Sequence, residues 1–187
     1  MRRGLFALLL AALLAPACVK PKPPVVSATA DPVALAPLRT DFATNEVVPA
    51  PERLREALTN TLEERNLKPR PVAEAELAEL FGAGRNSRHR LERLAVSDDG
   101  ATLLVLVEAE CTFFAQVAGR YRWIVAVKLT FADRDDLDAA LVRAFDVPVF
   151  LQFSHEKEDA ALAEATPNIE RKLGEMLDEI LAARQGG

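Results

Sequence analysis

The sequence has little of the residue types from which reactive sites are usually built. It contains two cysteines, two histidines and one tryptophan in 187 residues. The histidines, His89 and His155, are not spaced to share a metal ion with each other or with a cysteine. The serines all lie outside a G-x-S-x-G motif: Ser27, Ser87, Ser97 and Ser154. We therefore predict no catalytic residue, no metal site and no cofactor.

Long runs of basic residues are also missing. Lys and Arg number 23 against 28 Asp and Glu, which gives a net charge of -5. Nucleic-acid binding depends on neutralising phosphates, so this balance argues against a nucleic-acid partner. One local basic cluster lies over residues 85–90. We interpret it as a solvated loop and helix start, with a phosphate or lipid head-group contact as the alternative.

The only long apolar run is at the N-terminus. Arg2 and Arg3 precede the apolar residues 5–14, and the small residues 15–17 follow them. A charged start, a short apolar stretch and small residues are typical of a secretory signal peptide, which we assign to residues 1–17. The stretch is too short for a membrane-spanning helix, so the sequence predicts an exported protein.

Cys18 comes directly after this signal. The pentapeptide Leu14-Ala15-Pro16-Ala17-Cys18 resembles the lipobox of bacterial lipoproteins, although the leucine is four rather than three residues before the cysteine. The resemblance implies that Cys18 becomes the lipidated first residue, carrying palmitate or a similar chain. Cleavage after Ala17 by an ordinary signal peptidase is the alternative. A lipidated Cys18 leaves Cys111 without a disulfide partner, and we expect Cys111 to be a small buried apolar residue.

Residues 18–32 are predicted to form a tether. Four prolines, at positions 21, 23, 24 and 32, oppose both helix and sheet there. A chain of about fourteen residues at roughly 3.1 Å each reaches some 40 Å. Val19 follows Cys18, whereas in the enterobacterial lipoproteins that it resembles an Asp there favours the inner membrane. We therefore expect the periplasmic side of the outer membrane, with the inner membrane or a free periplasmic form as alternatives.

Residues 102–131 organise the rest of the chain. Their odd positions are apolar and many of their even positions are polar, which predicts two strands with one buried face. A three-residue loop over 117–119, with Gly119 in the left-handed conformation, places Phe113 opposite Trp123. A two-residue loop would pair apolar with polar positions, so we reject it. In this register Glu108 also faces Lys128, which predicts a cross-strand charge pair.

Local patterns assign the remaining elements. Pro37 makes the first strand an edge strand or a strand end, and Thr166-Pro167 predicts a kink or break in the C-terminal helix. The expected elements are strands over 33–39, 67–72 and 139–153 and helices over 51–66, 74–81 and 156–183. The expected fold is α/β (α+β): one mixed, largely antiparallel sheet of about four to five strands, with the C-terminal helix and one or two further helices packed on one face. The domain covers residues 33–184, and residues 185–187 fray.

This order of elements on a tethered, exported chain resembles the small α/β domains of envelope-assembly lipoproteins. Among these are the N-terminal domain of TolB, the curli-secretion lipoprotein CsgG, LpoB and LptE. The resemblance implies a non-enzymatic accessory that binds or positions another envelope protein, and it assigns no binding residue. It leaves the partner, the pathway and the oligomeric state open.

Three hypotheses follow for function. The first is a protein-binding module, with a partner surface near the hairpin tip formed by Phe114, Tyr121, Arg122 and Trp123. The second is a carrier that holds an amphipathic ligand in a groove between the sheet and the C-terminal helix. The third is a hydrolase that uses Glu108 and Glu110 as a carboxylate pair. Because alternating carboxylates on a strand are common, we favour the first.

Overall fold

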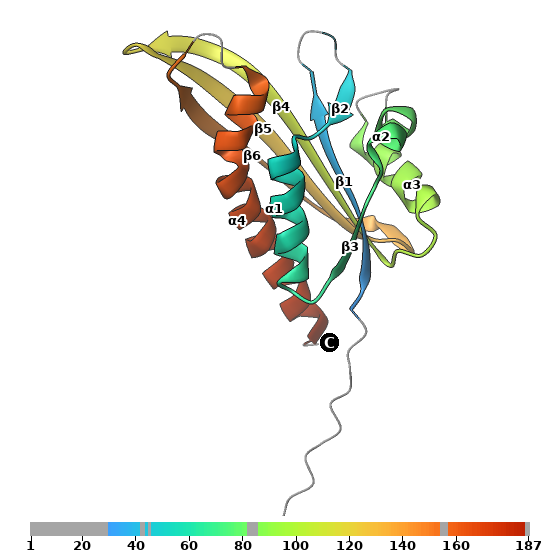
Figure 1. Ribbon diagram of the computed structural model, residues 1–187. Coiled ribbons are helices and arrows are strands. Elements are labelled where there is room, and N and C mark those ends of the chain that lie inside the picture. Colours follow the sequence, from blue (N-terminus) through green and yellow to red (C-terminus); the bar gives the residue numbers. More distant parts are fainter. Residues whose placement is uncertain (1–29, 42–43, 45, 82–85, 154–156, 186–187) are drawn as a thin grey trace, which may run out of the picture.

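The computed structural model describes residues 30–41, 44, 46–81, 86–153 and 157–185, without the side chains of residues 78 and 79. The predicted signal peptide, Cys18 and most of the tether lie outside these ranges. The described elements, shown in Figure 1, are β1 (Pro32–Thr40), β2 (Val47–Pro49), α1 (Glu52–Glu63), β3 (Lys68–Pro71), α2 (Glu74–Phe81), α3 (Ser87–Ser97), β4 (Leu103–Val117), β5 (Arg120–Asp133), β6 (Asp136–Leu151) and α4 (Glu158–Gln185).

The strands form one mixed sheet, as predicted. Its order is β2-β1-β4-β5-β6, and the short β3 pairs with β1 on the same side as β2. β1 runs parallel to β3 and β4, and the remaining pairs are antiparallel. α1 and α4 cover one face of this sheet (Figure 1). The predicted fold class is confirmed.

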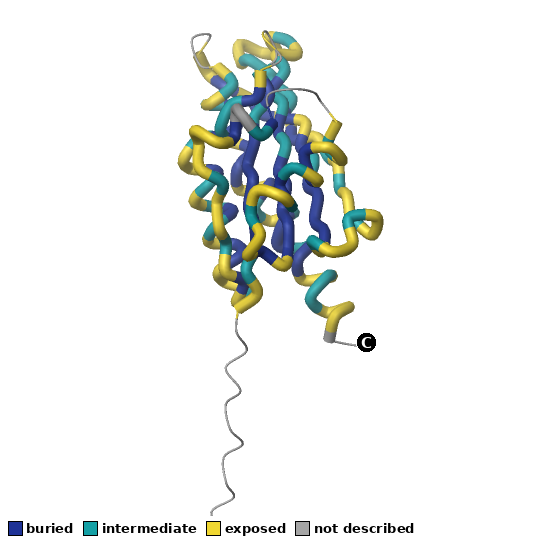
Figure 2. The backbone as a smooth tube through the Cα atoms, turned by 90° about the vertical axis from the view of Figure 1, so that its right-hand side faces the viewer, coloured by how far each residue is buried: buried dark blue, intermediate teal, exposed yellow. Residues whose placement is uncertain are grey.

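The structure adds a smaller helical layer on the other face. In β4, Leu103, Val105 and Val107 face the core under α1 and α4. The alternate residues Leu104 and Leu106 are fully buried against the core that α2 and α3 complete. This half of β4 is therefore apolar on both faces, and Figure 2 shows the buried strands between exposed helices and loops. The period-two pattern predicts only the larger of the two cores.

β1 is central in the sheet, so its prediction as an edge strand is wrong. Pro37 has no N–H to donate, but both neighbours on its outer side are short. β3 pairs with β1 only as far as Leu35, and β2 begins pairing at Leu38. The carbonyl of Pro37 accepts a hydrogen bond from Ala50 on that side, at 3.2 Å. Pro37 thus occupies a gap where no ladder donor is needed.

The register of the long hairpin is confirmed along most of its length. Phe113 pairs with Trp123 and Glu108 with Lys128. The predicted three-residue loop is wrong, because the turn is the two-residue Ala118-Gly119, with φ values of 49° and 79°. The register shifts between Phe113 and Ala115, so Phe114 is an extra residue in a β-bulge. The bulge restores the matching of apolar faces that a two-residue turn alone would destroy.

α4 continues without a break through Pro167. The Thr166 hydroxyl donates to the carbonyl of Leu162 at 2.9 Å, and Leu162 and Ile169, on either side of the proline, are fully buried. Pro167 itself is exposed, so water can reach the carbonyl that its ring leaves unpaired. Packing therefore outweighs the local signal for a break. Among the described residues, no helix is both long and apolar enough to cross a bilayer.

Candidate interaction surface

The long strands project beyond the body of the domain as an arm. β1 stops pairing with β4 at Thr40 and Glu110, whereas β4 continues to Val117. Seven further residues at about 3.3 Å each extend the hairpin by roughly 23 Å. We call residues 112–124, together with residues 148–151 of β6, the arm. It lies at the end of the domain opposite the start of β1 and the end of α4 (Figure 1).

One face of the arm is partly packed. The Phe113 ring lies edge-on to Trp123, with centroids 5.7 Å apart, and 6.4 Å from Tyr121. Tyr121 and Trp123 rest against the core under α4, and Phe113 is 49% exposed. Two of the predicted partner residues, Tyr121 and Trp123, are therefore anchored to the body of the domain.

The other face of the arm is open. Phe114 is 63% exposed and Phe150 is 47% exposed. The Arg122 guanidinium lies between them, 4.8 Å from the centroid of Phe114 and 6.0 Å from that of Phe150. The four predicted partner residues are thus divided between the two faces. Sequence analysis missed Phe150, although its even position in β6 indicated this face.

The arm differs in charge from the rest of the protein. No Asp or Glu occurs between Glu110 and Asp133, whereas Arg120 and Arg122 both lie at the tip. The chain as a whole carries a net charge of -5. The arm is therefore a cationic, aromatic end on an acidic protein.

Below the arm, the same sheet face holds a hollow of about 300 Å³. The hollow begins where α3 stops covering the sheet. Its lining comes from five elements and is mostly polar or small: Thr40 of β1, Ser87 and Arg90 of α3, Glu108 to Glu110 of β4, Ala126 to Lys128 of β5, and Ala144 to Asp146 of β6. We call the even-numbered side chains of β4 from Glu110 to Phe114, together with their neighbours on β5 and β6, the open face.

A buried ion pair closes the lower end of the hollow. Arg90 is only 4% exposed, and its Nη1 lies 2.5 Å from Oε1 of Glu108. The predicted charge pair of Glu108 with Lys128 is wrong, because Lys128 donates to Ser87 Oγ at 2.9 Å instead. The interpretation of residues 85–90 as a solvated cluster is wrong for Arg90, because its side chain is buried. No local pattern predicts this pair, because α3 brings Arg90 onto the sheet from outside the hairpin.

The carboxylates of the hydrolase hypothesis lie on the same face. Glu108 is held by Arg90, and Glu110 is half-buried two residues along the strand. The described residues include no group of three or more His, Cys, Asp or Glu side chains placed to hold a metal ion. Nothing in this part of the chain supports hydrolysis, and the hypothesis has no further basis in the structure.

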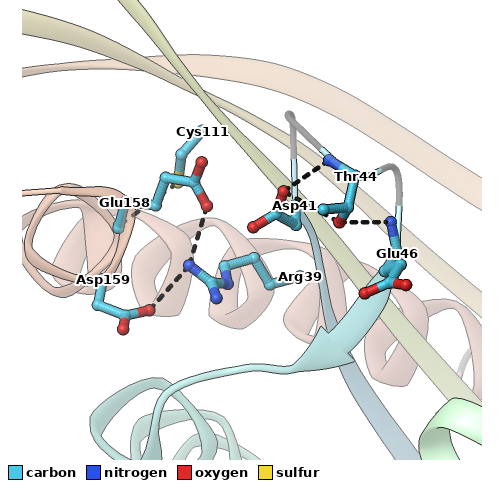
Figure 3. Close-up of polar contacts among 7 residues, drawn as sticks. All are labelled: Arg39, Asp41, Thr44, Glu46, Cys111, Glu158 and Asp159. Atoms are coloured by element: carbon cyan, nitrogen blue, oxygen red, sulfur yellow. Dashed lines mark hydrogen bonds and ion pairs between the residues drawn. The ribbon is translucent and has the colours of Figure 1, made fainter.

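A second charged cluster fixes α4 to the base of the arm (Figure 3). Arg39 at the end of β1 lies 3.0 Å from both Glu158 and Asp159. Cys111 is buried beside them, and its thiol donates to the carbonyl of Glu158 at 3.6 Å. Burial raises the pKa of Cys111 to about 12. Because thiolate is the reactive form, Cys111 is a poor nucleophile, which agrees with its expected role as a buried apolar residue.

Glu158 gives this cluster a pH dependence. Burial raises the pKa of its carboxyl above the ordinary 4.5, and Arg39 only partly opposes the rise. Between the ordinary pKa of 4.5 and the raised pKa of the folded state, the folded protein binds more protons than the unfolded chain. The free energy of unfolding therefore falls as pH rises across this interval. We expect Glu158→Gln to remove this contribution and to gain stability relative to wild type from pH 4 to pH 7. Urea unfolding across that range measures it, and parallel curves for the two proteins would contradict it.

No protein-family model matches the chain. No curated protein matches it either. Solved structures do. Lipoprotein GNA1162 from Neisseria meningitidis is 16% identical, with 78% of this chain and 99% of that one covered and a TM-score of 0.43. The C-terminal domain of LpoB from Salmonella enterica is 13% identical, covers 66% of this chain and 86% of its own, and has a TM-score of 0.35. The rare lipoprotein B from Shewanella oneidensis is 12% identical, with coverages of 83% and 95% and a TM-score of 0.31. LpoB, which the order of elements was predicted to resemble, is thus among the proteins to which this chain is similar.

Proposed function

We propose that this protein is a non-enzymatic, lipid-anchored accessory of the bacterial envelope that binds another envelope protein through the arm. The observation that carries the proposal is the pair of exposed rings Phe114 and Phe150 on the arm, with the half-buried Arg122 between them. Aromatic and arginine side chains are enriched among the few residues that contribute most of the binding energy in protein interfaces. Exposed large aromatics grouped on a projecting element are typical of an interaction site.

The placement of the arm supports the same function. The described chain enters at the foot of the domain, where β1 begins, and the arm lies at the far end (Figure 1). The 15 residues of β4 span about 50 Å at roughly 3.3 Å each. A tether attached through Cys18 joins the foot, so the arm extends away from the anchoring membrane. Its partner is then a protein that stands in the periplasm, and the outer membrane is the proposed anchor.

Site-specific photo-crosslinking in cells tests this function. We expect a photoreactive phenylalanine at position 114 to give one discrete crosslinked product that contains another envelope protein. The same probe at Val96, which is 81% exposed on α3, is the matched control and should give none. Arg122→Glu should remove the product from the first site, because it reverses the charge between the two rings. The same product from both sites, or no product from position 114, would contradict the proposal.

The carrier hypothesis receives no comparable support. Apolar residues buried to 6% exposure or less fill the space between the sheet and α4, among them Val125, Val127, Ile169 and Leu173. A groove for a ligand would need these side chains to separate. The hypothesis remains an untested alternative.

A further inference from the structure

Two carboxylates face the hollow without a partner. Glu110 of β4 pairs in register with Ala126 of β5, which in turn pairs with Asp146 of β6. Both acids therefore flank one alanine, two strand spacings or about 10 Å apart. Both line the hollow, and neither has an ion pair or side-chain hydrogen bond within the described chain. The methyl group of Ala126 leaves the space between them open.

The cations near these carboxylates are already engaged. Arg90 is paired with Glu108, and Lys128 is held by Ser87. The pair is nevertheless incompletely satisfied, because Nε of Arg90 and Oε2 of Glu108 are buried without hydrogen-bond partners. Arg90 is more than nine-tenths buried at the floor of the hollow. Lys128 balances only one of the two free carboxylates, so the hollow retains one negative charge.

We propose that the hollow binds a cationic side chain, arginine or lysine, presented by the protein that the arm contacts. This inference rests on the proposed function and names the chemistry of the partner. A guanidinium has several N–H donors in one plane, which suits two acceptor groups on either side of a small residue. The charge of the hollow is complementary to a single positive group.

The arm fixes the spacing of the partner's charges. Arg122 lies four residues from Ala126 along β5, which is about 13 Å. The partner segment therefore carries a basic residue and, roughly 13 Å away, an acidic or aromatic residue that meets Arg122. That separation equals about four residues of strand or about nine residues of helix. This pattern distinguishes the partner from an anionic lipid surface, which would offer no cation to the hollow.

Ligand-observed saturation-transfer NMR on the full chain in detergent micelles tests the hollow directly. The probe is N-acetyl-arginine amide, and its neutral isostere N-acetyl-citrulline amide is the control ligand. We expect binding of the arginine probe only, weakened at least fivefold by Glu110→Gln/Asp146→Asn. The charge-matched control Glu76→Gln/Asp135→Asn, at two exposed acids without ion pairs, should leave it unchanged. Equal binding of the two ligands, or an unchanged signal in the first variant, would overturn the proposal.

This NMR measurement needs no partner protein, so a negative result is distinct from failure of the proposed function. The link between the two is tested in cells with the crosslinking probe at position 114. We expect Glu110→Gln/Asp146→Asn to reduce the crosslinked product at least fivefold, with the Glu76→Gln/Asp135→Asn control unaffected. An unchanged product would overturn the assignment of the cation to the partner, even where the arginine probe binds.

Discussion

Replacing Glu108 with leucine is expected to lower the free energy of unfolding by about 3–5 kcal/mol. Its partner Arg90 is 4% exposed, so the substitution leaves a buried guanidinium without its counter-ion. α3 cannot shift to expose this guanidinium without a loss of packing, because Leu91 and Leu94 of the same helix are buried in the smaller core. Urea unfolding at neutral pH measures the loss.

The double variant Arg90→Leu/Glu108→Leu separates this effect from simple loss of packing. Replacement of both members of a buried pair by apolar side chains is often neutral or stabilising. We therefore expect the double variant to be within about 1 kcal/mol of wild type or more stable. Glu110→Leu, on the same strand and without a partner, is the control and should change stability by no more than about 0.5 kcal/mol. A double variant as unstable as Glu108→Leu alone would contradict the explanation.

The pair also connects stability to the open face. It ties α3 to β4 at the point where the helical layer ends, and the hollow begins directly beyond it. A protein that retained only one member of the pair would have no rigid lower wall for the hollow. The Arg90→Leu/Glu108→Leu variant replaces the ion pair with an apolar contact between α3 and β4, so we expect it to keep both this wall and the fold.

The middle of the hairpin was predictable because its information is local. From Val105 to Phe113, each inward position of β4 has an apolar partner on β5, and a shift by one residue would expose all of them. The tip was not predictable in the same way. The sequence pattern specifies that Phe113 must meet Trp123, but a longer turn and a bulge both satisfy it. The structure uses the bulge at Phe114, which also places that ring against Arg122.

The errors elsewhere come from contacts distant in sequence. Pro37 is typical of an edge strand, yet β1 tolerates it centrally because β2 and β3 are too short to cover that position. Glu108 faces Lys128 as predicted, but Arg90 from α3 arrives closer. Pro167 is typical of a helix break, yet burial of the residues on both sides of it keeps α4 continuous. In each case the local propensity was interpreted correctly, and tertiary packing determined the result.

Substitution of Cys18 by alanine is expected to have the largest effect on function. If Cys18 carries the lipid, the variant should move almost completely from the membrane fraction to the soluble fraction. Stable anchoring needs more than one acyl chain, and removal of the attachment residue removes all of them. Metabolic labelling with a fatty-acid probe, followed by fractionation, measures both consequences. A variant that remains labelled and membrane-bound would contradict the assignment of Cys18.

The same variant tests the proposal that the protein is anchored at the end of the domain opposite the arm. If residues 18–32 form the proposed tether of roughly 40 Å, they confine the arm to a thin layer beside the membrane, which raises its concentration near a partner in that layer. Release from the membrane should then lower the crosslinked product at position 114 by roughly 10²-fold, even though the arm itself is unchanged. Restoring anchorage with a foreign lipidation signal ahead of residue 18 should restore the product. If crosslinking persists undiminished in the soluble variant, the arm binds its partner tightly on its own, and the tether serves only to retain the protein.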